Sequence, residues 1–391
     1  MKKATRTHTK LHNRRLVLQT IYDDQPLSRA DIARLTHLTA TTVSNVVQDL
    51  MDEGLVQEVG SVSTGRGKPA TLLSLADSAF FIIGVDLGRR AFQGAVINLQ
   101  GKIVHRASVP SNGFTGNQAL ALVFELIDKL QIEVPGRLLG IGIGTPGIIN
   151  PDLGIAQKTV NFGWYDLPLQ GLVQERYQVP VRVANDCHLA VLAEYRFGRY
   201  KNQANLVLIR LGHGVGAGLI LNGELVHGHG FAAGEIGHIV LVDDGEPCSC
   251  GNNGCLETIA SSRAVIKQAQ TILNSEVEQN QASHLTDDIA SIVQAAKQGD
   301  RRLDSIIEEV GHYLGIALAQ IVGILNIPCI ALGGSVAQFG DPLIRIVRAE
   351  MGRRLIPDSV EQVQIHVSDL EPDIVLLGAA ALLLKYELGL V

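Results

Sequence analysis

Apolar positions recur along this chain with two different spacings, and the spacing changes near residue 80. Before residue 80, apolar residues three and four positions apart predict short helices, and alternating runs at 55–59 and 71–75 predict a hairpin. Beyond it, apolar runs of strand length alternate with Gly-rich turns and amphipathic stretches. This alternation is typical of an α/β body whose sheets are covered by helices.

The larger part of the chain can be divided into expected elements. The expected strands cover residues 80–85, 95–99, 138–143, 181–183, 206–211, 218–221 and 329–332. The expected helices cover residues 117–130, 187–198, 261–274, 287–298 and 302–325, and the polar segment 275–286 is expected to be a loop. No short-period repeat is found.

Three helices are predicted before the hairpin. Asn13 is the expected N-cap of the first. Ser28 and Asp31 have the spacing of a capping box, with Asp in place of Glu, and predict the start of the second helix. After a tight turn, the third helix is expected at 39–53 and ends where Gly54 takes the C′ position.

The third predicted helix has two different faces. Its inward stripe consists of Val43, Val46, Val47 and Leu50. Its outward face carries Thr41, Thr42, Ser44, Asn45 and Gln48. Because these outward side chains are short, polar and uncharged, they can enter a major groove and hydrogen-bond to base edges or phosphates.

Two basic residues, Arg66 and Lys68, lie at the Gly-flanked tip between the two hairpin strands. From such a tip they can reach phosphates or a narrow minor groove. A helix pair, a polar second helix and a basic wing in this order predict a winged helix-turn-helix that binds double-stranded operator DNA. A small helical module that binds another protein is the alternative. Because one such head reads few bases, we expect a dimer.

The charge is distributed unevenly. Residues 1–70 contain 10 Lys and Arg against 7 Asp and Glu, a net +3, whereas the remainder contains 23 against 32, a net −9. A basic head on an acidic body agrees with DNA binding confined to the head. The apolar runs are too short to cross a bilayer, and no signal core follows the basic N-terminus. We therefore expect a cytoplasmic protein without membrane contact.

Three of the five cysteines fall within eight residues, at Cys248, Cys250 and Cys255, and His238 precedes them by nine intervening residues. Three thiols and one imidazole form a complete tetrahedral ligand set for Zn²⁺. With four protein ligands the site is closed, so the zinc is expected to be structural. The odd count and the tight cluster favour metal over disulfides, although three incidental buried thiols would give the same composition.

These residues resemble the ROK family of repressors and sugar kinases. Segment 234–257 is similar to the zinc signature of that family, 142–147 (GIGTPG) to its sugar-side loop, and Asn185 and Asp186 to its catalytic pair. Its two phosphate motifs resemble 86–88 and 212–218, and its adenosine motif resembles 331–335. With the added head, the chain resembles the branch of xylose and N-acetylglucosamine repressors.

The resemblance implies a two-lobed actin/hexokinase-like (ribonuclease H-like) fold with a monosaccharide or sugar phosphate in the cleft between the lobes. It implies these sugar contacts: Asn161, Asn185, Asp186, Glu235, His238 and Glu257. His238 would have two roles, one ring nitrogen on zinc and the other on a sugar hydroxyl. The alternative to sugar contact is that these carboxylates are solvated charges in loops or, for Asp186, that the side chain caps the helix that follows.

The motifs for phosphate binding match the kinases of that family less completely than the motifs for sugar binding do. Asp186 has the position of a general base for phosphoryl transfer, as in the kinases of that family. However, Arg89 and Arg90 stand where those kinases have Gly and Thr, and His213 stands where they usually have Thr. Bulky side chains there oppose a close backbone approach to phosphate. We therefore expect a sensor without catalysis, and an active ATP-dependent sugar kinase that also binds DNA is the alternative.

Taken together, the sequence predicts a sugar-responsive transcription regulator, expected to be a repressor released by sugar. The expected domains are a winged helix-turn-helix at 1–76, a first lobe at 80–186 joined by 372–391, and a second lobe at 187–371 with the zinc site and the oligomerisation surface. The expected assembly is a homodimer or homotetramer.

Overall fold

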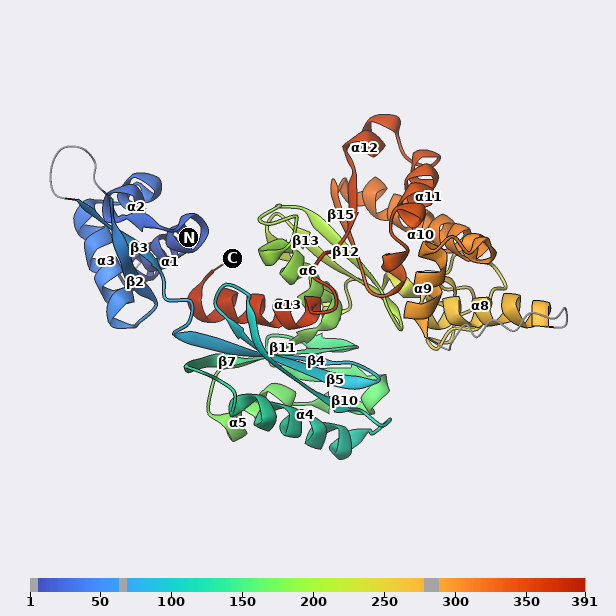
Figure 1. The fold of residues 1–391 in the computed structure, drawn as a ribbon, viewed down its shortest axis with the longest axis horizontal. Coiled ribbons are helices and arrows are strands. Elements are labelled where there is room, and N and C mark those ends of the chain that lie inside the picture. The colour runs from blue at the N-terminus through green and yellow to red at the C-terminus, as the bar shows by residue number, and fades with distance from the viewer. Residues whose placement is uncertain (1–5, 63–68, 278–287, 391) are drawn as a thin grey trace. The chain divides into compact units, whose positions relative to one another are not determined.

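The computed structural model describes residues 6–62, 69–277 and 288–390. The chain divides into two compact units (Figure 1). Unit 1 consists of Met1–Thr145, Pro151–Val183 and Ala379–Val391, and unit 2 consists of Pro146–Asn150 and Ala184–Gly378. Among the helices within the described ranges, none has both the length and the apolar content that a membrane span requires.

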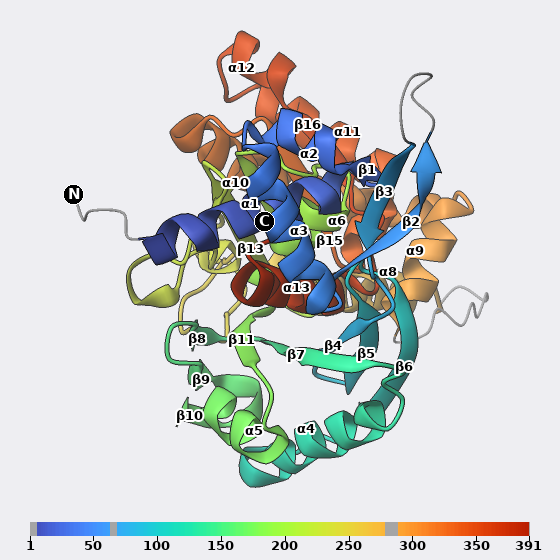
Figure 2. The same ribbon diagram turned by 90° about the vertical axis from the view of Figure 1, so that its left-hand side faces the viewer.

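The N-terminal head is a winged helix (Figures 1 and 2). Its elements are α1 (Arg6–Asp24), β1 (Leu27–Ser28), α2 (Arg29–Thr36), α3 (Ala40–Asp52), β2 (Val56–Val62) and β3 (Ala70–Leu75). The three strands form one sheet in the order β1-β3-β2. The inward stripe predicted for α3 is buried, as are Leu18 and Ile32 of the other two helices, so the apolar spacing correctly located the core of the head.

The ends of α2 and α3 follow local sequence signals. Ser28 caps α2, and its hydroxyl oxygen accepts from the Asp31 backbone N–H at 3.2 Å while the Asp31 carboxylate accepts from the Ser28 backbone N–H at 3.3 Å. Thr39 caps α3, and Gly54 follows that helix with a φ of +79°. These boundaries confirm the capping box and the glycine stop.

The start predicted for the first helix is wrong. Helix α1 already includes Arg6, so Asn13 lies inside it and is not its N-cap. No glycine or proline interrupts the described residues before Asn13. Two ion pairs also tie α1 to the last turn of α3 and its C-cap, one from Lys10 to Asp49 at 2.9 Å and one from Arg14 to Glu53.

A Ser28→Ala variant is expected to destabilise the head by about 1 kcal/mol at pH 7. The hydrogen bonds from Ser28 hold the pKa of Asp31 below its ordinary value. A depressed carboxylate pKa contributes stability above its unfolded value of 3.8, and that contribution is lost as the pH falls through the folded value. The cost of the substitution should therefore shrink as the pH falls below 3.8, as measured by pulsed hydrogen exchange of α2 peptides in increasing urea.

The matched control is Ser61→Ala, which removes an exposed hydroxyl from β2. It should leave the urea midpoint of the α2 peptides unchanged at both pH values. An equal loss in both variants would contradict a role for the capping box.

The rest of unit 1 is built on a five-stranded sheet in the order β11-β7-β4-β5-β6. Its strands are β4 (Phe80–Leu87), β5 (Ala91–Asn98), β6 (Ile103–Pro110), β7 (Arg137–Thr145) and β11 (Val181–Asn185), the last crossing into unit 2. The helices are α4 (Gly116–Gln131) and α5 (Leu169–Tyr177), with the hairpin β9 (Ile155–Thr159) and β10 (Trp164–Leu167) between them. Helix α13 (Ile374–Leu383) begins in unit 2 and ends in unit 1.

Unit 2 is built on a second five-stranded sheet, in the order β14-β13-β12-β15-β16. Its strands are β12 (Leu206–Leu211), β13 (Val215–Leu221), β14 (Glu224–Leu225), β15 (Cys329–Gly333) and β16 (Gln364–Val367), and the short β8 (Ile148–Asn150) also belongs to this unit. The helices are α6 (Asp186–Phe197), α7 (Glu257–Ala260), α8 (Ser262–Val277), α9 (Ile289–Lys297), α10 (Asp304–Leu325), α11 (Asp341–Gly352) and α12 (Pro357–Gln362).

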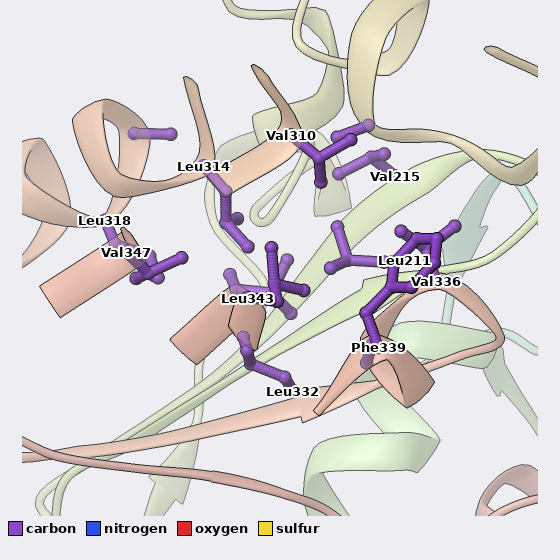
Figure 3. Packing of buried hydrophobic residues seen from close by; sticks show 14 of the residues in the cluster. Leu211, Val215, Val310, Leu314, Leu318, Leu332, Val336, Phe339, Leu343 and Val347 are labelled. Carbon is purple, nitrogen blue, oxygen red and sulfur yellow. The ribbon is translucent and has the colours of Figure 1, made fainter. Parts of the chain in front are cut away.

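The core of unit 2 lies between its sheet and helices α10 and α11. Figure 3 shows Leu314 and Leu343 from these helices beside Leu211 and Leu332 from β12 and β15. All four of these side chains are fully buried. This packing fixes the carboxyl ends of the two central strands, where the glycine-rich motifs begin.

The two large sheets repeat one topology. In each, three antiparallel strands are followed by a strand parallel to the first, namely β4-β5-β6 then β7, and β12-β13-β14 then β15. The mixed α/β architecture predicted from the alternating pattern is confirmed. The loop predicted at 275–286 is wrong for 275–277, because α8 continues to Val277 without a breaking residue, and residues 278–286 lie outside the described ranges.

Candidate functional site

Four potential metal ligands gather in unit 2. His238 ends the short 3-10 helix η3 (Ile236–His238), and the three thiols follow on the next loop. The ligand atoms of His238, Cys248, Cys250 and Cys255 all lie within 4.8 Å of one another. The sequence spacing therefore identified residues that meet in space.

The distances within this cluster fit a tetrahedral ion. Two sulfur ligands bound at about 2.3 Å with tetrahedral angles lie about 3.8 Å apart. The Sγ atoms of Cys250 and Cys255 are 3.7 Å apart, and Nδ1 of His238 is 3.5 Å from Sγ of Cys248. The backbone N–H of Asn252 lowers the pKa of Cys250, which favours the thiolate that binds metal.

The loop that holds the thiols folds back on itself. The Cys248 backbone N–H donates to Asn252 O at 2.8 Å, and Leu241 N–H donates to Gly254 O at 2.9 Å. At Gly254 the φ is +70°, and a Cβ atom would lie 1.8 Å from Val242 O. Only glycine fits there, so Gly254 is required by the backbone of the metal loop.

The second ring nitrogen of His238 faces away from the thiols. Its Nε2 atom lies 3.8 Å from Oε2 of Glu235. Burial raises the pKa of Glu235, and the carboxylates of Asp186 and Glu257 raise it further while His238 opposes them. The Glu235 side chain is nevertheless 45% exposed, so a small ligand can reach it. The imidazole thus connects the metal cluster to a cluster of carboxylates.

Asn185 and Asp186 lie where β11 ends and α6 begins. Asn185 is the N-cap of α6: its Oδ1 accepts from the backbone N–H groups of Cys187 and His188, and its Nδ2 donates to Gly147 O at 3.0 Å. The cap reading considered for Asp186 is therefore wrong, because the helix already includes that residue. Asp186 instead accepts from Arg210 at 2.7 Å.

Glu257 begins the short helix α7 and contacts a glycine-rich turn. Its Oε2 accepts from the Val215 backbone N–H at 3.0 Å, and its Oε1 lies 3.7 Å from Arg263. The Glu257 carboxylate therefore holds the turn between β12 and β13 by a hydrogen bond. This turn carries the second phosphate-like motif. Within unit 2, the carboxylates of Asp186 and Glu257 both act electrostatically on Glu235.

Asn161 belongs to unit 1. It lies in the 3-10 helix η1 (Val160–Phe162), and its side chain is exposed. Its neighbours Phe162 and Trp164 are buried and stack at 5.0 Å between ring centroids. This aromatic pair fixes the turn that presents Asn161, and its role stays a prediction.

The candidate DNA-reading surface is the outward face of α3. Thr41, Ser44, Asn45 and Gln48 are exposed and Thr42 is half-buried. Thr42 is held by Thr39, with the two hydroxyl oxygens 2.9 Å apart, and the Gln48 amide donates to Asp52 at 2.8 Å. Arg66 and Lys68, the predicted wing contacts, lie outside the described residues.

One phosphate-like segment and the adenosine-like segment have identifiable surroundings. Arg89 and Arg90 are exposed on the turn between β4 and β5, and the Ser111 backbone N–H donates to Arg90 O at 3.0 Å. At the adenosine-like segment, the Gly334 backbone N–H donates to the Glu371 carboxylate at 2.6 Å. This backbone donor is therefore already bound by a negative group.

Two residues near the carboxylate cluster were missed in the sequence. Arg210 lies 24 positions from its partner Asp186, and no local spacing connects them. His188 is buried in α6, and its Nε2 contacts Ala233 O at 3.1 Å next to the loop of Glu235. Burial lowers the pKa of His188 to about 4, so the ring is neutral and donates to that carbonyl.

Two family models match the chain. The model of the ROK family matches residues 82–386, and the model of the MarR family matches residues 13–67. The first covers nearly all of the lobed body, and the second covers most of α1 together with α2, α3, β1 and β2 of the head.

Individual relatives match over different shares of the chain. A xylose repressor from Caldicellulosiruptor bescii is 33% identical over 380 residues, covering 95% of this chain and 95% of that protein. A glucokinase from Halalkalibacterium halodurans is 32% identical over 316 residues, covering 78% of this chain and 95% of that enzyme.

A solved structure superposes on nearly the whole chain. It is described as a ROK family transcriptional regulator, a homolog of the E. coli MLC protein. It superposes with a TM-score of 0.84 at 28% identity and covers 98% of each chain. The regulator-type relatives thus match nearly the full length, whereas the glucokinase does not.

Proposed function

This chain belongs to the ROK family, and we propose that it is a sugar-responsive repressor of transcription whose N-terminal winged helix reads operator DNA. The observation that carries this proposal is the full-length match to repressors, which includes both the head and the body. The repressed genes are expected to serve carbohydrate use, since the relatives are named for sugars.

Each part of the chain has its own role in this proposal. Residues 1–76 form the DNA reader, with Thr41, Thr42, Ser44, Asn45 and Gln48 toward the base edges and Arg66 and Lys68 toward phosphate. In this proposal residues 80–186 with 372–391, and residues 187–371, form the two lobes, whereas the compact units divide the chain after Val183 and after Gly378. Because a single reading helix contacts few bases, the functional unit is a homodimer or homotetramer on double-stranded DNA.

The sugar contacts of this proposal are polar side chains. Asn185, Asp186, Glu235, His238 and Glu257 supply donors and acceptors, and Asn161 supplies an amide. A sugar needs several such groups at fixed angles around its hydroxyls. The ligand is a monosaccharide or a sugar phosphate.

The cysteine cluster holds a structural zinc ion in this proposal. His238, Cys248, Cys250 and Cys255 occupy all four positions of a tetrahedral ion, which leaves none for an activated water. The bound ion would fix the ring of His238, and its Nε2 would then present a donor toward a sugar hydroxyl beside Glu235. This arrangement links metal content to sugar response.

Catalysis is not part of the proposal. Arg89 and Arg90 replace the small residues of a phosphate loop, and Glu371 already binds the Gly334 backbone N–H. Correct placement of phosphate supplies most of the rate in phosphoryl transfer. The second candidate is an ATP-dependent sugar kinase that also binds DNA, which the glucokinase relative and the presence of Asp186 favour.

Sugar is expected to weaken operator binding. By linkage, a sugar that lowers operator affinity by a given factor has its own affinity lowered by that factor when operator is bound. Fluorescence anisotropy of labelled operator should fall when a sugar from a panel of D-xylose, D-glucose, N-acetyl-D-glucosamine and their phosphates is added. D-xylose is the first choice because the repressor relative is named for it.

The same panel decides between the two candidates. With ATP and a coupled assay for ADP, the protein should show no turnover with any of these sugars. Steady turnover would favour the kinase, and operator affinity unchanged by all of the sugars would remove the sensing role.

A further inference from the structure

Arg210 lies on the central strand of the second sheet in an unusual setting. Its register partners on both sides are glycines, Gly216 on β13 and Gly333 on β15. Paired residues project to the same face of a sheet, so no side chain of the two register partners lies beside Arg210 on that face. A Cβ atom at Gly216 would lie 2.7 Å from Sγ of Cys187, so this face of the sheet meets the start of α6.

The contact that Arg210 makes there is with Asp186. Its Nη1 donates to Oδ2 of Asp186 at 2.7 Å, and the two side chains are only 22% and 18% exposed. The other carboxylate oxygen of Asp186 accepts from the Cys187 backbone N–H at 3.0 Å. Both oxygens are therefore oriented, and each keeps a second lone pair for another donor.

The surrounding charges make this pairing necessary. Asp186 and Glu257 are both close enough to Glu235 to act on its charge. Each has a basic neighbour within unit 2: Arg210 at 2.7 Å from Asp186, His238 at 3.8 Å from Glu235, and Arg263 at 3.7 Å from Glu257. The Asp186 pair is the shortest and the least exposed of the three, so Asp186 depends most on its partner.

We propose that Arg210 is a positioning residue that fixes Asp186 as a charged acceptor for a sugar hydroxyl and opposes its use as a kinase base. The proposal rests on the sugar-binding function above. A base for phosphoryl transfer takes the hydroxyl proton and becomes neutral. A neutral Asp186 would lose its ion pair with the guanidinium, so Arg210 favours binding over proton transfer.

A double-mutant cycle on the full-length, zinc-loaded protein tests this role. Arg210→Met, Asp186→Asn and the double variant are titrated by calorimetry with the sugar of the panel that binds the wild type. Arg210→Met should weaken sugar binding about tenfold or more. Because Arg210 acts through Asp186, the double variant should bind no more weakly than Asp186→Asn alone. Arg210→Lys keeps the charge and should recover most of the affinity.

The matched control is Arg302→Met, which removes another partly buried arginine whose guanidinium pairs with Asp300 at 2.5 Å. It should leave sugar affinity unchanged. Zinc content and operator affinity report whether each variant is folded, and Arg210→Gln replaces Arg210→Met in the cycle if the latter does not fold.

The outcomes separate the two proposals. Wild-type affinity in Arg210→Met, or losses that add in the double variant, overturns the role of Arg210 and leaves the repressor function standing. If the wild type binds no sugar of the panel, the repressor function fails and the role of Arg210 fails with it.

Discussion

A Cys250→Ser variant is expected to lose bound zinc and the sugar response together. Sγ of Cys250 lies 3.7 Å from Sγ of Cys255, as two ligands of one tetrahedral ion would. A serine hydroxyl is a poor replacement for a thiolate ligand, because it remains protonated at neutral pH. Structural zinc sites contribute on the order of 10 kcal/mol to folding, so the loop from Cys248 to Cys255 should open.

The sugar response should disappear because His238 belongs to both sites. Its Nδ1 lies 3.5 Å from Sγ of Cys248, while its Nε2 faces Glu235. Without the ion, the ring is no longer held in that orientation. Zinc is measured with a colorimetric chelator after denaturation, and the response is measured as the change in operator anisotropy on adding sugar.

Cys329→Ala is the matched control for the zinc prediction. Cys329 is a buried thiol of β15 that is not among the four clustered residues. This variant should keep one zinc per chain and respond to sugar like the wild type. Zinc retained by Cys250→Ser at wild-type stoichiometry would show that the ligand set is wrong.

An Asn45→Asp variant should lose operator binding by about a hundredfold or more. Asn45 is exposed on α3, so a carboxylate of the same shape does not disturb the core of the head. Placed against DNA, the new negative charge costs several kcal/mol by repulsion from the phosphates, and every 1.4 kcal/mol is about tenfold in affinity. Anisotropy of labelled operator at fixed salt measures the loss.

Gln100→Glu makes the same change of amide to acid at an exposed position outside the head. It alters the net charge of the protein equally, so it controls for long-range electrostatics. Its operator affinity should remain within about twofold of the wild type. A similar loss in both variants would mean that Asn45 does not face the DNA.

Local signals predicted the parts of the fold that depend on neighbours in sequence. The capping box of Ser28 and Asp31, the stop at Gly54 and the buried stripe of α3 are all decided within four residues or so, and the structure confirms them. The cysteine spacing succeeded for the same reason, since one short loop brings three of the four potential ligands together.

Features that depend on tertiary context were missed. Strand β16 and helix α12 are short, and β6 has an exposed, half-polar face. Helix α11 was overlooked although its buried residues Leu343, Val347 and Met351 lie four positions apart. The pair of Arg210 and Asp186 forms only because β12 lies beside the start of α6. Asn13 was misread as a cap because the ion pairs that extend α1 come from α3, which is distant in sequence.

Unit 1 consists of stretches that are far apart in the chain, and this affects how it can fold during synthesis on the ribosome. The residues from 379 onward belong to this unit, although most of its sheet is encoded before residue 146. Leu383, Leu384 and Leu390 emerge from the ribosome after the residues of unit 2, and all three are buried. Domains fold as units while the chain is being made, so the head can fold early while the first lobe waits until unit 2 has been synthesised. A chain that stopped before residue 379 would therefore have a folded head and an incomplete first lobe.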